Sequence, residues 1–187
     1  MMKAKTKKPK IKKISTIRKR LLREWSEAVR SRVDFTCELC GKKKSDFSEK
    51  GVHEKIDAHH FLAKEIKDCP LKFDIRNGVA VCPFCHKFGI PSFHRDPIRT
   101  ITWLIKNRPD DYAFVRDNAD IRIDLENRQV LEEIEIRLLA KEPLDLEKLK
   151  KIEKQFCRNT KKPEIEGNIF DQLAEPKTDP TELLLSS

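Results

Sequence analysis

Residues 77–88, NGVAVCPFCHKF, hold the features that decide the predicted fold. An Asn-Gly turn signal opens the segment, and the short apolar run behind it has the composition of a β-strand. The strand leads directly into a Cys-Pro-Phe-Cys turn and then into His86, at the start of a predicted short helix. One segment therefore combines a strand, two thiols and an imidazole.

The chain carries two Cys-x-x-Cys pairs, Cys37/Cys40 and Cys82/Cys85. This spacing lets two turns supply four thiolates to a tetrahedral zinc ion, so the sequence predicts a structural zinc site. Four buried or redox-active thiols are the alternative, and a second alternative has His86 replacing Cys85 as a ligand. Cys69 and Cys157 have no partner at ligand spacing and are interpreted as ordinary thiols.

A first strand is predicted in residues 55–61, KIDAHHF, where His59 and His60 are adjacent. Neighbouring strand residues point to opposite faces, whereas Asp57 and His59 share one face. Asp57 could then accept the N–H of a metal-bound imidazole, bind the metal itself, or face solvent. Taken alone, the two histidines would be one surface residue beside one packing residue, but their place between the cysteine pairs and ahead of Asn77 and His86 favours a functional pair.

The order His60, Asn77, His86, set between two cysteine pairs, resembles the HNH endonucleases of the ββα-metal class. The resemblance covers roughly residues 20 to 95, and residues 24–41, EWSEAVRSRVDFTCELCG, also resemble the segment that leads into phage and bacterial members. It implies an α+β fold, a small zinc-stabilised hairpin and helix with flanking helices on both sides.

The resemblance also implies an activity, hydrolysis of phosphodiester bonds with one divalent metal ion (Mg²⁺, Mn²⁺, Ni²⁺ or Zn²⁺). His60 matches the general base, and its backbone is expected to have left ideal strand geometry so that its ring reaches the same phosphate as His59. His59 and His86 match metal ligands, and Asn77 matches the residue that braces the loop. His94 departs from the family spacing, and is a third ligand, a phosphate contact or a loop histidine.

The net charge of +9 and the pI near 9.3 favour an anionic partner, and nucleic acid, above all double-stranded DNA, is the expected one. The basic residues of the predicted helix between Arg18 and Arg32 would extend a phosphate-binding track. Six cations flank the proposed site in sequence and are candidate phosphate contacts: Lys42, Lys43, Lys44, Arg76, Lys87 and Arg95.

Four segments are predicted along the chain: a basic flexible arm (1–16), the nuclease domain with its N-terminal helix (17–108), a helical extension (109–160) and an acidic disordered tail (161–187). Within them, periodic apolar residues and caps predict helices over 17–33, 97–108, 110–118, 125–140 and 145–157.

No apolar run is long enough to span a membrane, and a cytoplasmic protein of a bacterium or a phage-infected cell is expected. Two rival functions are a zinc-stabilised nucleic-acid-binding module without catalysis, and an adaptor that holds a protein partner through its C-terminal helices. The pattern assigns no oligomeric state.

Overall fold

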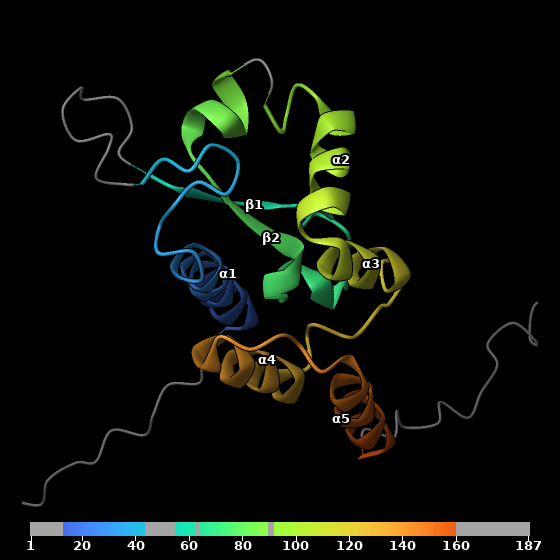
Figure 1. The fold of residues 1–187 in the computed structure, drawn as a ribbon. Coiled ribbons are helices and arrows are strands. Elements are labelled where there is room, and N and C mark those ends of the chain that lie inside the picture. The colour runs from blue at the N-terminus through green and yellow to red at the C-terminus, as the bar shows by residue number, and fades with distance from the viewer. Residues whose placement is uncertain (1–12, 44–54, 63, 90–91, 160–187) are drawn as a thin grey trace, which may run out of the picture.

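The predicted N-terminal helix runs from Ile14 to Ser31 and is labelled α1 in Figure 1. The computed structural model describes residues 13–43, 55–62, 64–89 and 92–159. The helix begins inside the predicted arm. This start was not predicted, because Lys13 makes no side-chain cap that would mark it in the sequence. The remainder of that arm, residues 1–12, lies outside the described residues.

The two predicted strands form an antiparallel pair, β1 (Asp57–His60) and β2 (Gly78–Val81). Asp57 pairs with Val81, and His60 pairs with Gly78. β2 is buried at all four positions, as its continuous apolar sequence predicts. Helices together with this small sheet confirm the predicted α+β class.

The helices after the sheet follow the predicted pattern within a few residues. A short π-type helix spans Phe84–Phe88. The four α-helices after this π-type helix are α2 (Pro97–Asn107), α3 (Pro109–Asp117), α4 (Arg128–Ala140) and α5 (Leu146–Asn159). Helix α2 is capped by Asp96, whose carboxylate accepts a hydrogen bond from the Arg99 amide at 2.9 Å. None of the described helices has the length and hydropathy of a membrane span.

Two 3₁₀ helices between the strands, Pro70–Phe73 and Ile75–Asn77, were not predicted. The sequence PLKFDIRN carries no extended periodicity because each helix is a single turn. Asp74 separates the two turns and is fully buried; its carboxylate accepts hydrogen bonds from the Arg76 side chain and from the Leu144 amide. These turns set the path of the chain from β1 to β2.

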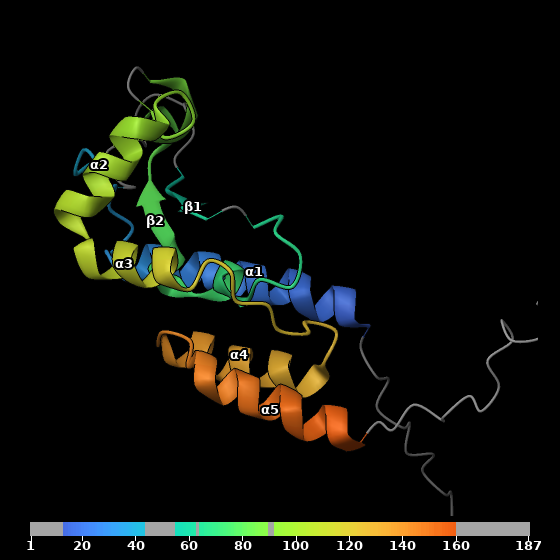
Figure 2. The same cartoon turned by 90° about the vertical axis from the view of Figure 1, so that its right-hand side faces the viewer.

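Helix α1 lies between the sheet and α4, and α5 packs beside α4 on the side away from the sheet (Figures 1 and 2). The apolar core is continuous from Ile17 on α1 to Leu149 on α5. The predicted extension of residues 109–160 therefore shares one core with the sheet and α1. The predicted acidic tail, residues 161–187, lies outside the described residues.

Gly78 is a point of close approach between α1 and β2. A Cβ atom at this position would lie 2.5 Å from a methyl carbon of Val29 and 2.8 Å from the Trp25 ring. We therefore expect Gly78→Ala to lower the free energy of unfolding by about 1–3 kcal/mol, the usual cost of overpacking a core. Urea denaturation checks this, and an unchanged midpoint would show that α1 can move away without cost.

Candidate functional site

The four predicted cysteines come together at one end of the sheet. Their sulfur atoms all lie within 4.8 Å of one another, and those of Cys40 and Cys82 are 3.8 Å apart. Glu38, inside the first pair, joins the pairs: its amide donates to the Ala80 carbonyl at 2.9 Å, and its carboxylate accepts from the Ala80 amide at 2.8 Å. The first turn is thereby fixed to the strand that carries the second pair.

This donor set fits a structural metal such as zinc. Zinc–sulfur bonds of about 2.3 Å place the sulfurs of a tetrahedral site about 3.8 Å apart, close to the Cys40–Cys82 distance. Cys37, Cys82 and Cys85 are buried, and Cys40 is exposed. Cys85 belongs to this cluster and His86 does not, so the alternative in which His86 replaces Cys85 is not the arrangement found.

Burial and mutual contact shift the pKa values of the clustered thiols. Burial raises the pKa of Cys37 to about 11 and also raises that of Cys85. The pKa of Cys40 is lowered, since hydrogen bonds from the Lys42 amide and from neighbouring thiols outweigh its burial. Buried thiols hold their protons unless a metal ion displaces them.

A second cluster consists of His59 on β1, His86 on the π-type helix and His94 in the turn before α2; we call it the histidine cluster. Their ring nitrogens lie within 4.8 Å of one another. His86 Nε2 is 3.2 Å from His59 Nδ1 and 3.2 Å from His94 Nε2. Metal–nitrogen bonds of about 2.0–2.1 Å place ligand atoms about 3.0–3.4 Å apart, so these spacings fit one shared ion.

Asp57 fixes the tautomer of His86. Its Oδ2 lies 2.9 Å from His86 Nδ1, and a carboxylate can only accept, so Nδ1 carries the proton and Nε2 presents a lone pair. Asp57 thus accepts the N–H of a candidate metal ligand, which is one of the roles considered from sequence. The ligand that it contacts is His86 on the π-type helix. The hydrogen bond from His86 lowers the pKa of Asp57.

His94 reaches the cluster because the chain turns back after the π-type helix. The Phe93 amide donates to the Cys85 carbonyl at 2.9 Å, and the His94 amide donates to the His86 carbonyl at 3.3 Å. Of the three roles considered for His94, the geometry favours metal ligand. Burial, together with the neighbouring histidines, lowers the pKa of His59 to about 3 and also lowers that of His94, so both rings are neutral at neutral pH.

His60 faces α1. Its ring is stacked on Trp25, with centroids 3.6 Å apart and planes 12° apart, and its Nε2 lies 2.9 Å from the Lys72 carbonyl oxygen. A carbonyl only accepts, so Nε2 carries the proton and Nδ1 presents the lone pair. Burial lowers the pKa of His60 to about 4, which keeps the ring neutral.

The expectation that the backbone has left strand geometry at His60 is wrong. The ladder continues through both histidines, with His59 opposite Val79 and His60 opposite Gly78, so the rings turn to different neighbours as regular pleating requires. The two side chains nevertheless border one cavity of about 440 Å³, because they lie at the end of the strand, where it opens to solvent. Lys64 and Lys87 also line this cavity.

Asn77 is fully buried and braces the chain on both sides of the His60 ring. Its Oδ1 accepts from the Leu62 amide at 2.7 Å, and its Nδ2 donates to the carbonyls of Leu62 and Leu71 at 3.2 and 3.0 Å. The segment that follows His60 and the segment that supplies the Lys72 carbonyl are therefore held by one side chain.

The six candidate phosphate contacts do not share one environment. Lys42, Lys43, Lys87 and Arg95 are exposed, and only Lys87 lines the cavity of the histidine cluster. Lys44 lies outside the described residues. Arg76 is held by the Asp74 carboxylate and the Leu144 carbonyl and stacks on Phe114, so the geometry favours a structural role for it over phosphate contact.

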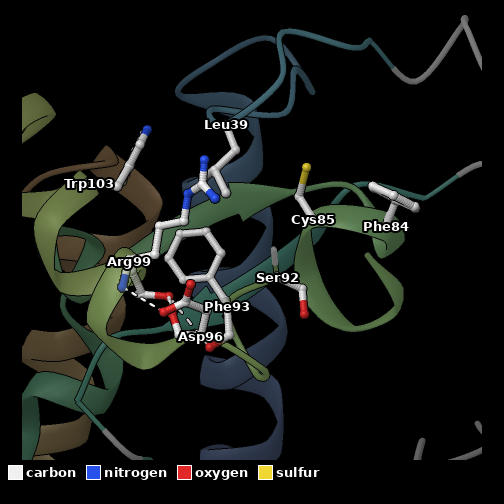
Figure 3. Close-up of a pocket in the computed structure, with 9 residues that line it drawn as sticks. Leu39, Phe84, Cys85, Ser92, Phe93, Asp96, Arg99 and Trp103 are labelled. Atoms are coloured by element: carbon white, nitrogen blue, oxygen red, sulfur yellow. Dashed lines mark hydrogen bonds between the residues drawn. The ribbon is translucent and has the colours of Figure 1, made fainter. Parts of the chain in front are cut away.

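A cavity of about 250 Å³ lies on the other side of Phe93, between the cysteine cluster and α2 (Figure 3). Phe93 contacts His59 on one side and Trp103 on the other, with ring centroids 5.2 and 6.1 Å apart. Arg99 extends from α2 across this cavity toward Leu39. Phe93 thus forms an apolar wall between the two candidate metal centres.

Trp25 and the Lys72 carbonyl are the site groups that sequence reasoning missed. From sequence, Trp25 falls only within the apolar pattern of the helix predicted over 17–33, and no side-chain pattern marks a backbone carbonyl. No protein-family model, curated protein or solved structure matches the chain. The geometry of the residues is accordingly the basis for assigning a function.

Proposed function

We propose that this protein is a metal-dependent endonuclease of the HNH type that hydrolyses phosphodiester bonds in nucleic acid, with double-stranded DNA as the leading substrate. The observation that carries the proposal is the convergence of the three ring nitrogens of the histidine cluster beside a fourth histidine whose free lone pair is on Nδ1. Ligands for an ion and a separate base are the two functions that metal-assisted hydrolysis requires.

His60 is the proposed general base. With the Nε2 proton held by the Lys72 carbonyl, Nδ1 is the atom that takes a proton from the attacking water. The resulting imidazolium keeps its Nε2–H hydrogen bond, so proton transfer leaves no buried donor without a partner. Asn77 supports this step by fixing the segments on both sides of the ring.

His59, His86 and His94 would hold the divalent ion, and the Asp57 carboxylate orients His86 so that its Nε2 lone pair faces the cluster. The bound ion would polarise a phosphate oxygen and offset the negative charge that grows on the leaving 3′ oxygen. The four cysteines would hold a separate zinc ion that joins β2 to the first turn.

Positive charge supports an anionic polymer as substrate. Two lysines, Lys64 and Lys87, and one carboxylate, Glu65, border the cavity that contains the histidines, and Arg95 is exposed in the turn that carries His94. Such cations position a sugar–phosphate backbone without reading its sequence. Their binding contribution weakens as salt concentration rises, because it depends on the release of counterions.

A plasmid-cleavage assay tests the proposal. Zinc-loaded protein is incubated with supercoiled DNA and, in separate reactions, with Mg²⁺, Mn²⁺, Ni²⁺ or additional Zn²⁺, and we expect nicked circles that are absent after treatment with a chelator. DNA that is bound in a salt-dependent manner but never cut would contradict the proposal and favour a zinc-stabilised binding module. Neither binding nor cutting would favour a protein adaptor.

A further inference from the structure

Trp25 contacts the proposed base over a whole ring face. The indole and the His60 imidazole are 3.6 Å apart between centroids and 12° from parallel, and Trp25 itself is 2% exposed. The indole N–H donates to the Asp74 carbonyl at 2.9 Å, so the indole cannot turn without losing a buried hydrogen bond. The plane against which His60 lies is therefore fixed.

One short segment fixes both rings. Lys72 supplies the carbonyl that binds His60 Nε2, and Asp74, two residues later, supplies the carbonyl that binds the Trp25 indole. This segment is itself immobilised, because Asn77 donates to the Leu71 carbonyl and the Asp74 carboxylate accepts from the Leu144 amide. The His60 ring, through Nε2, and the Trp25 indole, through its N–H, are therefore both hydrogen-bonded to the backbone of residues 72–74.

A hydrogen bond at one ring nitrogen leaves the imidazole free to swing about that bond, so the Lys72 carbonyl alone does not aim Nδ1. A stacked indole removes this freedom, because tilting the ring would break contact over its whole face. The same indole face also favours the imidazolium formed after proton transfer, through a cation–π interaction.

We propose that Trp25 is a positioning residue for the His60 base, acting with the Lys72 and Asp74 carbonyls to aim Nδ1 at the attacking water. This inference rests on the proposed function. It goes beyond that function by giving a residue of the N-terminal helix a part in the hydrolysis rate in addition to its part in the core.

Two substitutions separate positioning from packing. Trp25→Leu keeps an apolar side chain but removes the flat ring, whereas Trp25→Phe keeps one aromatic ring that can stack and loses the N–H together with part of the stacking area. We expect Trp25→Leu to lower the single-turnover cleavage rate at saturating DNA roughly 10- to 100-fold, as a small misplacement of a catalytic group does. DNA affinity and zinc content should stay unchanged, and Trp25→Phe should recover most of the rate.

Leu21, one turn before Trp25 on the same helix and 0% exposed, gives the matched control: Leu21→Ala should lose stability but, once folded, cleave at the wild-type rate. NMR of ring-labelled His60 provides a readout independent of cleavage, since loss of the indole should remove the ring-current shift of the His60 protons in Trp25→Leu but not in Leu21→Ala. The inference would be overturned if Trp25→Leu cleaved DNA at the wild-type rate. It would also be overturned if Trp25→Leu and Trp25→Phe lost cleavage rate equally and in proportion to their losses of stability. Absence of cleavage by the wild type would instead overturn the proposed function, and this inference with it.

Discussion

Replacement of His60 by alanine is expected to lower the rate of plasmid cleavage roughly 10²- to 10⁴-fold, the usual contribution of a positioned general base. The reason is geometric: of the four histidines at the site, His60 is the one whose ring lies outside the histidine cluster, with its Nε2 proton committed to the Lys72 carbonyl. Single-turnover kinetics at saturating DNA and saturating divalent ion measure the loss directly.

Both metal centres should survive this substitution, because His60 belongs to neither cluster. The structural cost should be at least about 1 kcal/mol, since the stack with Trp25 contributes that much beyond the area it buries. Metal content and thermal melting are therefore the controls. A variant that keeps both ions and its fold, yet cuts DNA at the wild-type rate, would show that another group takes the proton.

Replacement of Cys82 by alanine is expected to remove the zinc ion and to lower the melting temperature by about 8–16 °C. An ion present at about 1,000 times its dissociation constant stabilises a protein by about 4 kcal/mol, and each kcal/mol corresponds to about 2–4 °C in a chain of this size. The loss should affect the whole fold, because Cys37, Cys82 and Cys85 belong to the same apolar core as α1, α4 and α5.

Cys69→Ala is the matched control for this prediction. Cys69 and Cys82 are each 1% exposed, so the two substitutions remove the same atoms from equally buried positions. Cys69 is not in the cysteine cluster, and its variant should keep one zinc ion per chain. The opposite result would be that Cys82→Ala keeps the same zinc content as Cys69→Ala and loses the same stability. The four sulfurs would then form a thiol cluster and not a metal site.

The parts of the fold that follow from local pattern were predictable. The apolar run of β2, the Asp-Pro start of α2 and the four-residue spacing on α1 each specify an element within its own segment. The gathering of four cysteines was also predictable, since a metal explains paired thiols at that spacing. Each of these elements and each cysteine pair is specified by neighbouring residues, and the shared metal ion accounts for the meeting of the two pairs.

The remaining features depend on contacts between distant segments. The stack of Trp25 on His60 requires the packing of α1 against the sheet, and the return of His94 to the cluster requires backbone hydrogen bonds to Cys85 and His86. Arg76 was assigned to phosphate because the sequence does not reveal its distant partners, the Leu144 carbonyl and the Phe114 ring. The expectation of a distorted strand at His60 failed because the strand end already brings both histidines to one cavity.

The central claim is that the histidine cluster and His60 together hydrolyse a phosphodiester bond. The most direct measurement compares wild type and His60→Ala on one supercoiled plasmid, at one saturating Mn²⁺ concentration, with zinc content verified in both. The account predicts nicked DNA with 3′-hydroxyl and 5′-phosphate ends from the wild type and almost none from the variant. Intact plasmid in both reactions, or equal nicking in both, would contradict it.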